Sequence, residues 1–180
     1  MRRIAAACAA LALLSLTGCF FSQPRLVQPG PSAIREMEKD SPERFAKVAC
    51  ISLINAVDKK DLDKFLLFSD MEFLAEAAGN DPEQTKAEME KTDWSVLFST
   101  DLVESVENGV YVNDIQDRLS YLKGSEEYPA IDLDRITGAY RYELPGSGQV
   151  YVLCIDGEWK VDLALVNVAE RIQNEQEKDS

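Results

Sequence analysis

Cysteine and histidine usage decides most of the chemistry that this sequence can perform. The 180 residues include four cysteines, Cys8, Cys19, Cys50 and Cys154, and no histidine. A serine or cysteine nucleophile assisted by a histidine base is therefore impossible, and zinc sites built on imidazole are excluded. Histidine is also the commonest general base near neutral pH. The composition predicts no metal and no cofactor, and it favours a non-catalytic protein.

Cys19 follows a segment that has the pattern of a secretion signal. Met1-Arg2-Arg3 is basic, and the stretch from Ile4 to Leu16 is almost wholly apolar. An apolar run of about 13 residues is shorter than the roughly 17–25 residues that a membrane-spanning helix needs. The run closes with Leu16-Thr17-Gly18-Cys19, which resembles the lipobox of bacterial lipoproteins.

This resemblance implies that residues 1–18 are a cleaved signal peptide and that Cys19 carries lipid. Several acyl chains hold a protein on a membrane stably, whereas a single chain binds only marginally. In lipoproteins of two-membrane bacteria, an aspartate after the cysteine favours the inner membrane. Phe20 stands there in this chain, which resembles the pattern of outer-membrane lipoproteins that face the periplasm. The alternative is an ordinary signal peptide that happens to contain a cysteine.

Two further cysteines, Cys50 and Cys154, remain after cleavage. Cys50 lies in the apolar arc of a predicted helix, and Cys154 lies on the apolar face of a predicted hairpin. If the helix packs on the hairpin, the thiols can form a disulfide in an oxidising compartment. Such a bond closes a loop of about 100 residues, for which chain-entropy models give up to 4–5 kcal/mol. The alternative is two buried free thiols.

Acidic residues outnumber basic ones, 32 to 19, and the net charge of −13 falls to about −15 when Arg2 and Arg3 leave with the signal. A chain this acidic is repelled by phosphate backbones, so nucleic acid is disfavoured as a partner. Residues 19–41 contain Pro24, Gly30 and Pro31 among polar residues and predict a flexible tether. Residues 42–174 then form a single domain, and residues 175–180 form a disordered tail.

Helices are predicted in the first two thirds of the domain. Ser41-Pro42-Glu43 begins a helix that extends to about Asp58 and buries Phe45 and Cys50 on its apolar side. Asp61 begins a short second helix. Ser69-Asp70-Met71-Glu72 has the form of a capping box that starts a third. Further helices are expected from Asp81 to about Phe98 and from Asn113 to Lys123.

Strands are predicted in the last third, at 135–144, 149–155 and 158–165, with a break near Asp134. Asp156-Gly157 is a two-residue hairpin turn, which sets Ile155 opposite Glu158 and Cys154 opposite Trp159. One face of this hairpin is entirely apolar. The other face carries Glu158, Lys160 and Asp162 beside Tyr151, Leu153 and Ile155, so it is expected to be partly exposed. A terminal helix follows Val166.

Tyrosines and paired acids are the remaining candidates for chemistry. Tyr140 and Tyr142 lie on the predicted core face, where aromatic rings usually serve packing. Asp132 and Asp134 point away from the apolar residues beside them, which favours a solvated sheet edge.

Helices followed by an antiparallel sheet indicate an α+β fold. The segment from Phe45-Ala46-Lys47-Val48 to Phe65 and the closing Asp156-Gly157-Glu158-Trp159-Lys160-Val161-Asp162 are similar to small secreted members of the nuclear transport factor-like superfamily. The resemblance implies N-terminal helices packed in a curved C-terminal sheet as a cone. It also implies a small apolar ligand or, in some members, an isomerase or dehydratase site.

Three functions therefore stay open. The first is a membrane-anchored, non-catalytic protein that binds an envelope protein or a small apolar ligand. The second is a pocket enzyme that uses a buried carboxylate as its general base. The third is a subunit of a larger envelope assembly, for which Tyr151, Leu153 and Ile155 would form an exposed apolar patch. The alternative is that the terminal helix covers these three residues.

Overall fold

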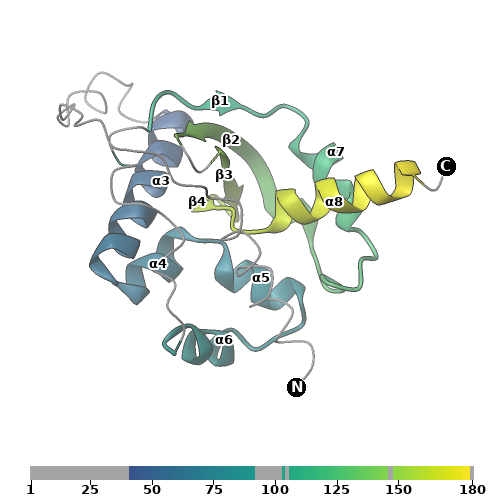
Figure 1. Cartoon of the computed structure of the whole chain (residues 1–180), viewed down its shortest axis with the longest axis horizontal. Coiled ribbons are helices and arrows are strands. Elements are labelled where there is room, and N and C mark those ends of the chain that lie inside the picture. The colour runs from purple at the N-terminus through teal and green to yellow at the C-terminus, as the bar shows by residue number, and fades with distance from the viewer. Residues whose placement is uncertain (1–40, 92–102, 104–105, 146–147, 179–180) are drawn as a thin grey trace.

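The computed structural model describes residues 41–91, 103, 106–145 and 148–178. Helices precede and flank a four-stranded antiparallel sheet of order β1-β2-β3-β4 (Figure 1), which confirms the α+β class. Within these ranges no helix is long and apolar enough to cross a bilayer. The elements are α3 (Pro42–Lys59), α4 (Leu62–Phe68), α5 (Met71–Ala77), α6 (Pro82–Met89), β1 (Val110–Tyr111), α7 (Ile115–Leu119), the 3-10 helices η4 (Ser120–Leu122) and η5 (Leu133–Arg135), β2 (Ile136–Leu144), β3 (Gly148–Ile155), β4 (Glu158–Val161) and α8 (Leu165–Lys178).

The first two helices begin where their capping residues predict. The Ser41 hydroxyl accepts a hydrogen bond from the backbone N–H of Arg44, and the Asp61 carboxylate accepts one from Lys64. Both bonds satisfy N–H groups that a helix leaves free in its first turn. The helix predicted from Asp81 is observed as Pro82–Met89, and its expected continuation to Phe98 lies largely outside the described residues. At the other end of the chain, α8 extends to Lys178 and so includes most of residues 175–180, which were predicted to form a disordered tail.

The C-terminal hairpin has the predicted register. Ile155 pairs with Glu158, Cys154 with Trp159 and Val152 with Val161. The expected break near Asp134 is the 3-10 helix η5, and the pairing of β2 with β3 shifts between Ile136 and Gly138. Local turn chemistry therefore fixes the pairing of β3 with β4, because a two-residue loop admits one alignment of its flanking strands.

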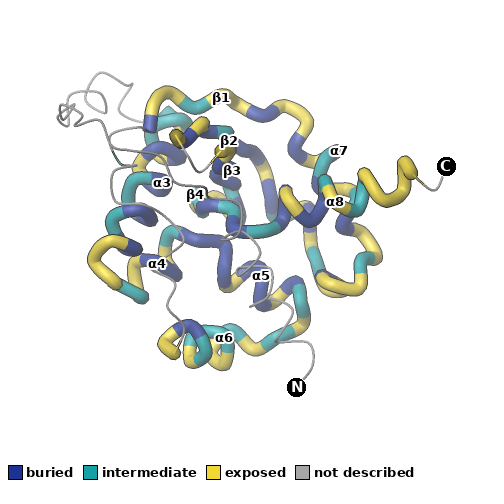
Figure 2. The backbone as a smooth tube through the Cα atoms, in the orientation of Figure 1, coloured by how far each residue is buried: buried dark blue, intermediate teal, exposed yellow. Residues whose placement is uncertain are grey.

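The core lies on both faces of the sheet (Figure 2). On one face, α3 packs against β3 and β4, and the Tyr142 hydroxyl donates a hydrogen bond to the carbonyl of Glu43 (3.2 Å). On the other face, α7 packs on β2 and α8 packs on α7 and η4. Of the two alternatives for Tyr151, Leu153 and Ile155, an exposed patch or cover by the terminal helix, the exposed patch is wrong, because all three side chains are buried.

Candidate functional site

A groove of about 390 Å³ runs between the first two helices and the C-terminal hairpin. We refer to it as the apolar groove. One wall belongs to α3 and α4, and the other to β4 and the turn before it. Its lining residues are Phe45, Val48, Ala49, Leu67, Phe68, Gly157, Glu158, Trp159 and Lys160. Binding sites for small molecules usually measure roughly 300–1,000 Å³, so the space suffices for a ligand or a few side chains of a partner.

Exposed apolar side chains lie along the helical wall. Phe45 is 48% exposed, Leu67 is 54% exposed and Val48 is 37% exposed. The prediction that α3 buries Phe45 with Cys50 is therefore wrong for Phe45, because the side chain projects over the groove instead of the sheet. Large apolar side chains that gather on one surface are a common mark of a binding site.

Aromatic rings extend from the groove across the sheet. Trp159 lies 5.5 Å from Tyr140, and Tyr140 lies 5.3 Å from Tyr111 on β1, measured between ring centroids. Gly138 lies beneath the row, where a Cβ atom would stand 3.4 Å from the Tyr111 hydroxyl and 3.8 Å from the Trp159 ring. Tyr140 thus packs between Tyr111 and Trp159, in line with its predicted packing role. The row of rings forms an aromatic surface beside the groove.

The two charged residues of the groove neutralise each other. Lys160 Nζ lies 2.9 Å from a carboxylate oxygen of Glu158, and it donates a hydrogen bond to the carbonyl of Leu67 (2.6 Å). Neither side chain is held as an acid or base toward the apolar walls. The groove therefore presents mostly apolar walls, and its two ionisable side chains are paired with each other.

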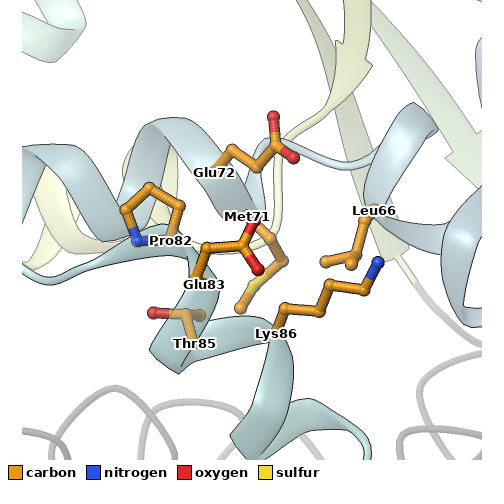
Figure 3. Close-up of a pocket in the computed structure, with 7 residues that line it drawn as sticks. All are labelled: Leu66, Met71, Glu72, Pro82, Glu83, Thr85 and Lys86. Atoms are coloured by element: carbon orange, nitrogen blue, oxygen red, sulfur yellow. The ribbon is translucent and has the colours of Figure 1, made fainter.

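A second cavity lies between α4, α5 and α6 (Figure 3) and is far smaller. Its volume of about 30 Å³ is close to that of one water molecule. Lys86 at its edge pairs with Asp63 at 3.1 Å. This cavity offers no room for a substrate.

Two aspartates, Asp70 and Asp162, bring their carboxyl groups together inside the protein, and we call them the carboxyl pair. Asp70 is 1% exposed and lies between α4 and α5. One of its oxygens accepts a hydrogen bond from the backbone N–H of Leu163 (3.1 Å). The Asp162 oxygens accept three hydrogen bonds at the start of α8, from Ala164 (3.2 Å), Leu165 (2.8 Å) and Val166 (3.1 Å).

The electrostatics of the carboxyl pair favour one proton on Asp70. Burial and then the neighbouring charge of Asp162 raise the pKa of Asp70 well above the ordinary aspartate range. Burial also raises the pKa of Asp162, but its three backbone hydrogen bonds oppose this shift. Asp70 Oδ2 is buried with no hydrogen-bond donor on it. A proton on Asp70 would allow one carboxyl group to donate a hydrogen bond to the other.

Sequence reasoning missed both members of this pair. The predicted capping box starting at Ser69 is wrong, because α5 begins at Met71 and the Asp70 side chain makes no cap hydrogen bond. Asp162, expected on the partly exposed face of the hairpin, turns inward to cap α8. An aspartate three residues before Leu165 is an N-cap signal that could have identified Asp162. No local signal identifies Asp70, because its partners lie far away along the chain.

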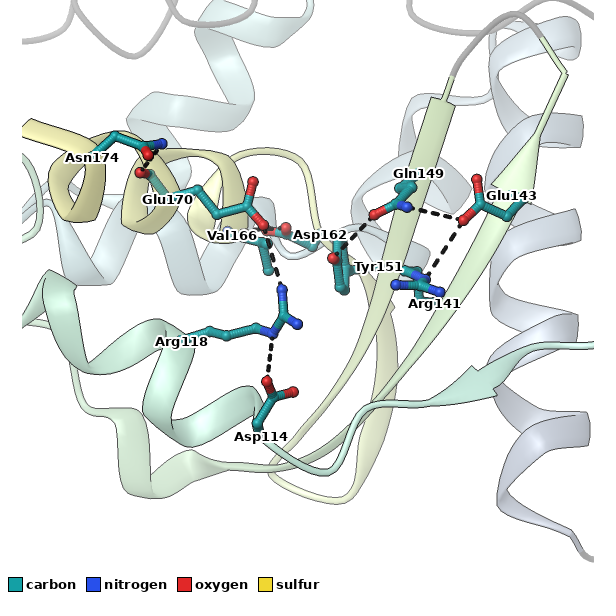
Figure 4. A network of polar contacts seen from close by, with 10 residues as sticks. All are labelled: Asp114, Arg118, Arg141, Glu143, Gln149, Tyr151, Asp162, Val166, Glu170 and Asn174. Atoms are coloured by element: carbon teal, nitrogen blue, oxygen red, sulfur yellow. Dashed lines mark hydrogen bonds and ion pairs between the residues drawn. The ribbon is translucent and has the colours of Figure 1, made fainter. Parts of the chain in front are cut away.

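Surface ion pairs account for the remaining polar clusters (Figure 4). Arg118 of α7 pairs with Asp114 at 3.0 Å and with Glu170 of α8 at 3.6 Å. Where β2 ends and β3 begins, the Gln149 amide donates to Glu143 (2.9 Å). Asp132, a predicted surface acid, caps η5 by accepting a hydrogen bond from the backbone N–H of Asp134 (3.1 Å). Exposed pairs of this kind connect elements and contribute little free energy.

The remaining predicted site residues are cysteines. Cys19 and the lipobox lie outside the described residues. Cys50 is buried on α3, Cys154 is partly exposed on β3, and both thiols are free in this structure. Burial raises the pKa of the Cys50 thiol to about 12, which disfavours its thiolate and hence nucleophilic chemistry. The disulfide between Cys50 and Cys154 stays a prediction.

No group of three or more cysteine, aspartate or glutamate side chains in the described ranges is arranged to hold a metal ion. Comparison of the chain with models of protein families, with curated proteins and with solved structures finds no match in any of the three. Functional inference therefore depends on the geometry of the apolar groove and the carboxyl pair.

Proposed function

We propose that this protein is a membrane-anchored extracytoplasmic lipoprotein whose domain binds an extended apolar segment of another envelope protein. The lipid on Cys19 would hold the domain at the outer membrane on its periplasmic side, through the tether of residues 19–41. The apolar groove would be the binding site. The observation that carries the proposal is the set of exposed apolar side chains, Phe45, Val48 and Leu67, along a groove that ends on Trp159.

An extended peptide suits the groove because one of its walls is the last strand of the sheet. On its inner side β4 pairs with β3. On its outer side the described residues make a single bridge, between Val161 and Ser69, at the far end of the strand. A strand edge offers backbone N–H and C=O groups to an incoming chain, and side-chain pockets beside it give specificity. A small apolar ligand would fill the groove without using this edge.

A pocket enzyme of the isomerase or dehydratase type is the weaker alternative. It needs a carboxylate inside a cavity, with a raised pKa and room for substrate. Asp70 meets the electrostatic requirement. Neither of the two cavities described above is lined by Asp70 or Asp162, however, which weakens this alternative.

Photo-crosslinking in intact cells tests the binding site. The photoreactive residue p-benzoyl-phenylalanine would replace Phe45 or Leu67, with Val110 as the control because it is 56% exposed and lies outside the groove. We expect crosslinks at the two groove positions to an apolar peptide segment of an envelope protein, and none at Val110. Equal crosslinking at all three positions would contradict the proposal. Adducts to acyl chains would show that the groove binds a lipid and not a peptide.

The anchor requires its own experiment. Cys19→Ser removes the sulfur that the lipobox resemblance assigns to lipid. We expect the variant to leave the membrane fraction, since the domain then has no acyl chains to hold it. Continued association of Cys19→Ser with membranes, at the level of the unchanged chain, would refute the anchor without bearing on the groove.

A further inference from the structure

The two walls of the apolar groove meet at one end, immediately beside the carboxyl pair. The helical wall continues from Phe68 into Ser69 and Asp70. The strand wall continues from Lys160 through Val161 into Asp162. Ser69 and Val161 form the bridge between the walls, and the backbone N–H of Asp70 donates to the carbonyl of Val161 (3.0 Å).

The contacts of Asp70 hold the helical wall against the strand wall. Its backbone bonds to Val161, and its side chain accepts from the N–H of Leu163. Its Oδ2 atom is buried without a hydrogen-bond donor, and the carboxyl group of Asp162 lies near enough to interact with that of Asp70. Two ionised carboxylates in this position would repel each other at a site with little water to screen them.

No cationic group compensates the carboxyl pair among the described residues. Apart from Asp70 and Asp162 themselves, the titratable group that faces them is Tyr128, from the loop between η4 and η5. Burial, followed by the charges of Asp70 and Asp162, raises the pKa of the Tyr128 hydroxyl, so it stays neutral. Arg171 of α8 and Glu127 lie beyond the tyrosine and pair with each other. The proton on the carboxyl pair is therefore the group that can remove the repulsion.

We propose that the carboxyl pair is a pH-sensitive clamp on the apolar groove: one shared proton holds the two walls together, and loss of that proton separates them. Below the raised pKa of Asp70 the groove keeps the shape described above. Above it, a second charge weakens the contacts of Asp70 with Val161 and Leu163, and the end of α4 moves away from β4. Peptide binding by the proposed function, on which this regulation rests, would then weaken as the pH rises.

Amide hydrogen exchange on the ligand-free protein tests the clamp independently of any partner. The reporters are the N–H groups of Asp70 and Leu163, which make the two hydrogen bonds that join Asp70 to the strand wall and its continuation. After correction for intrinsic exchange, we expect their protection to fall about tenfold for each pH unit from about pH 4 up to the raised pKa of the pair, and to level off above it. In Asp70→Asn the amide donates to Asp162 permanently, so protection should not change with pH. The matched control is Asp132→Asn, which removes an exposed acid outside the clamp.

Two outcomes would overturn the proposal. One is protection of both amides that stays constant from pH 4 to pH 9 in the unchanged chain. The other is the same loss of protection in Asp70→Asn as in the unchanged chain. If Asp70→Asn does not fold, the pH dependence of protection in the unchanged chain and in Asp132→Asn still tests the first outcome. The two experiments can give different answers. If hydrogen exchange shows the pH response but the groove positions do not crosslink to a peptide, the clamp is confirmed and peptide binding is refuted.

Discussion

The stability of this protein should fall as the pH rises, because of Asp70. In the unfolded chain an aspartate has a pKa of about 3.9, whereas burial and the charge of Asp162 raise the pKa of Asp70 in the folded state. The folded protein therefore binds a proton that the unfolded chain has lost. The stabilisation from this proton is complete below about pH 4 and disappears as the pH rises through the raised pKa of Asp70. One proton changes the free energy of unfolding by about 1.4 kcal/mol per pH unit in that window.

Asp70→Asn isolates this effect because asparagine keeps the shape and both hydrogen bonds. Its oxygen accepts from Leu163, and its amide donates to Asp162 without titrating. In urea unfolding at a series of pH values, the variant should gain about 1.4 kcal/mol over the unchanged chain for each pH unit above pH 4, until the raised pKa is passed. Since native domains have roughly 5–15 kcal/mol of stability, one or two units suffice for measurement. A difference that stays constant with pH would refute the shared proton, and Asp132→Asn serves as the control.

Three further results are expected. Asp162→Ala removes the acceptors of three N–H groups at the start of α8 and should cost about 1–2 kcal/mol in chemical unfolding. Gly109→Ala places a Cβ atom 2.7 Å from the buried Tyr142 ring and should cost about 1–3 kcal/mol in the same assay. Mass spectrometry of unreduced, alkylated protein from the periplasm should show Cys50 joined to Cys154, and alkylation of both thiols would contradict the disulfide.

Substitutions of the exposed groove residues should leave the stability of the fold almost unchanged. Leu67 is 54% exposed, so truncating it changes little buried area, and surface substitutions usually alter stability by about 0.5 kcal/mol or less. Its role, if the proposed function holds, is in the bound state. For this reason the crosslinking experiment, and not stability, is the measurement that bears on the groove.

The local sequence was sufficient to predict where several elements begin. Ser41 and Asp61 mark the starts of α3 and α4, and Asp156-Gly157 sets the register of the hairpin. In each case the cause lies within a few residues: a side chain satisfies a nearby N–H group, or a short turn admits one pairing. The change from helical to alternating apolar spacing likewise predicted helices before the sheet and hence the α+β class.

Only the tertiary structure decided which side chains are buried and which carboxyl groups meet. Periodicity placed Phe45 in the core and left open whether Tyr151 is exposed or covered. The fold exposes Phe45 and buries Tyr151, because burial depends on which elements cover a face. Asp70 and Leu163 are 93 residues apart in the chain, so no local pattern could pair them. Capping and turn formation are short-range, whereas the carboxyl pair and the apolar groove exist only after the chain has brought α4 beside β4.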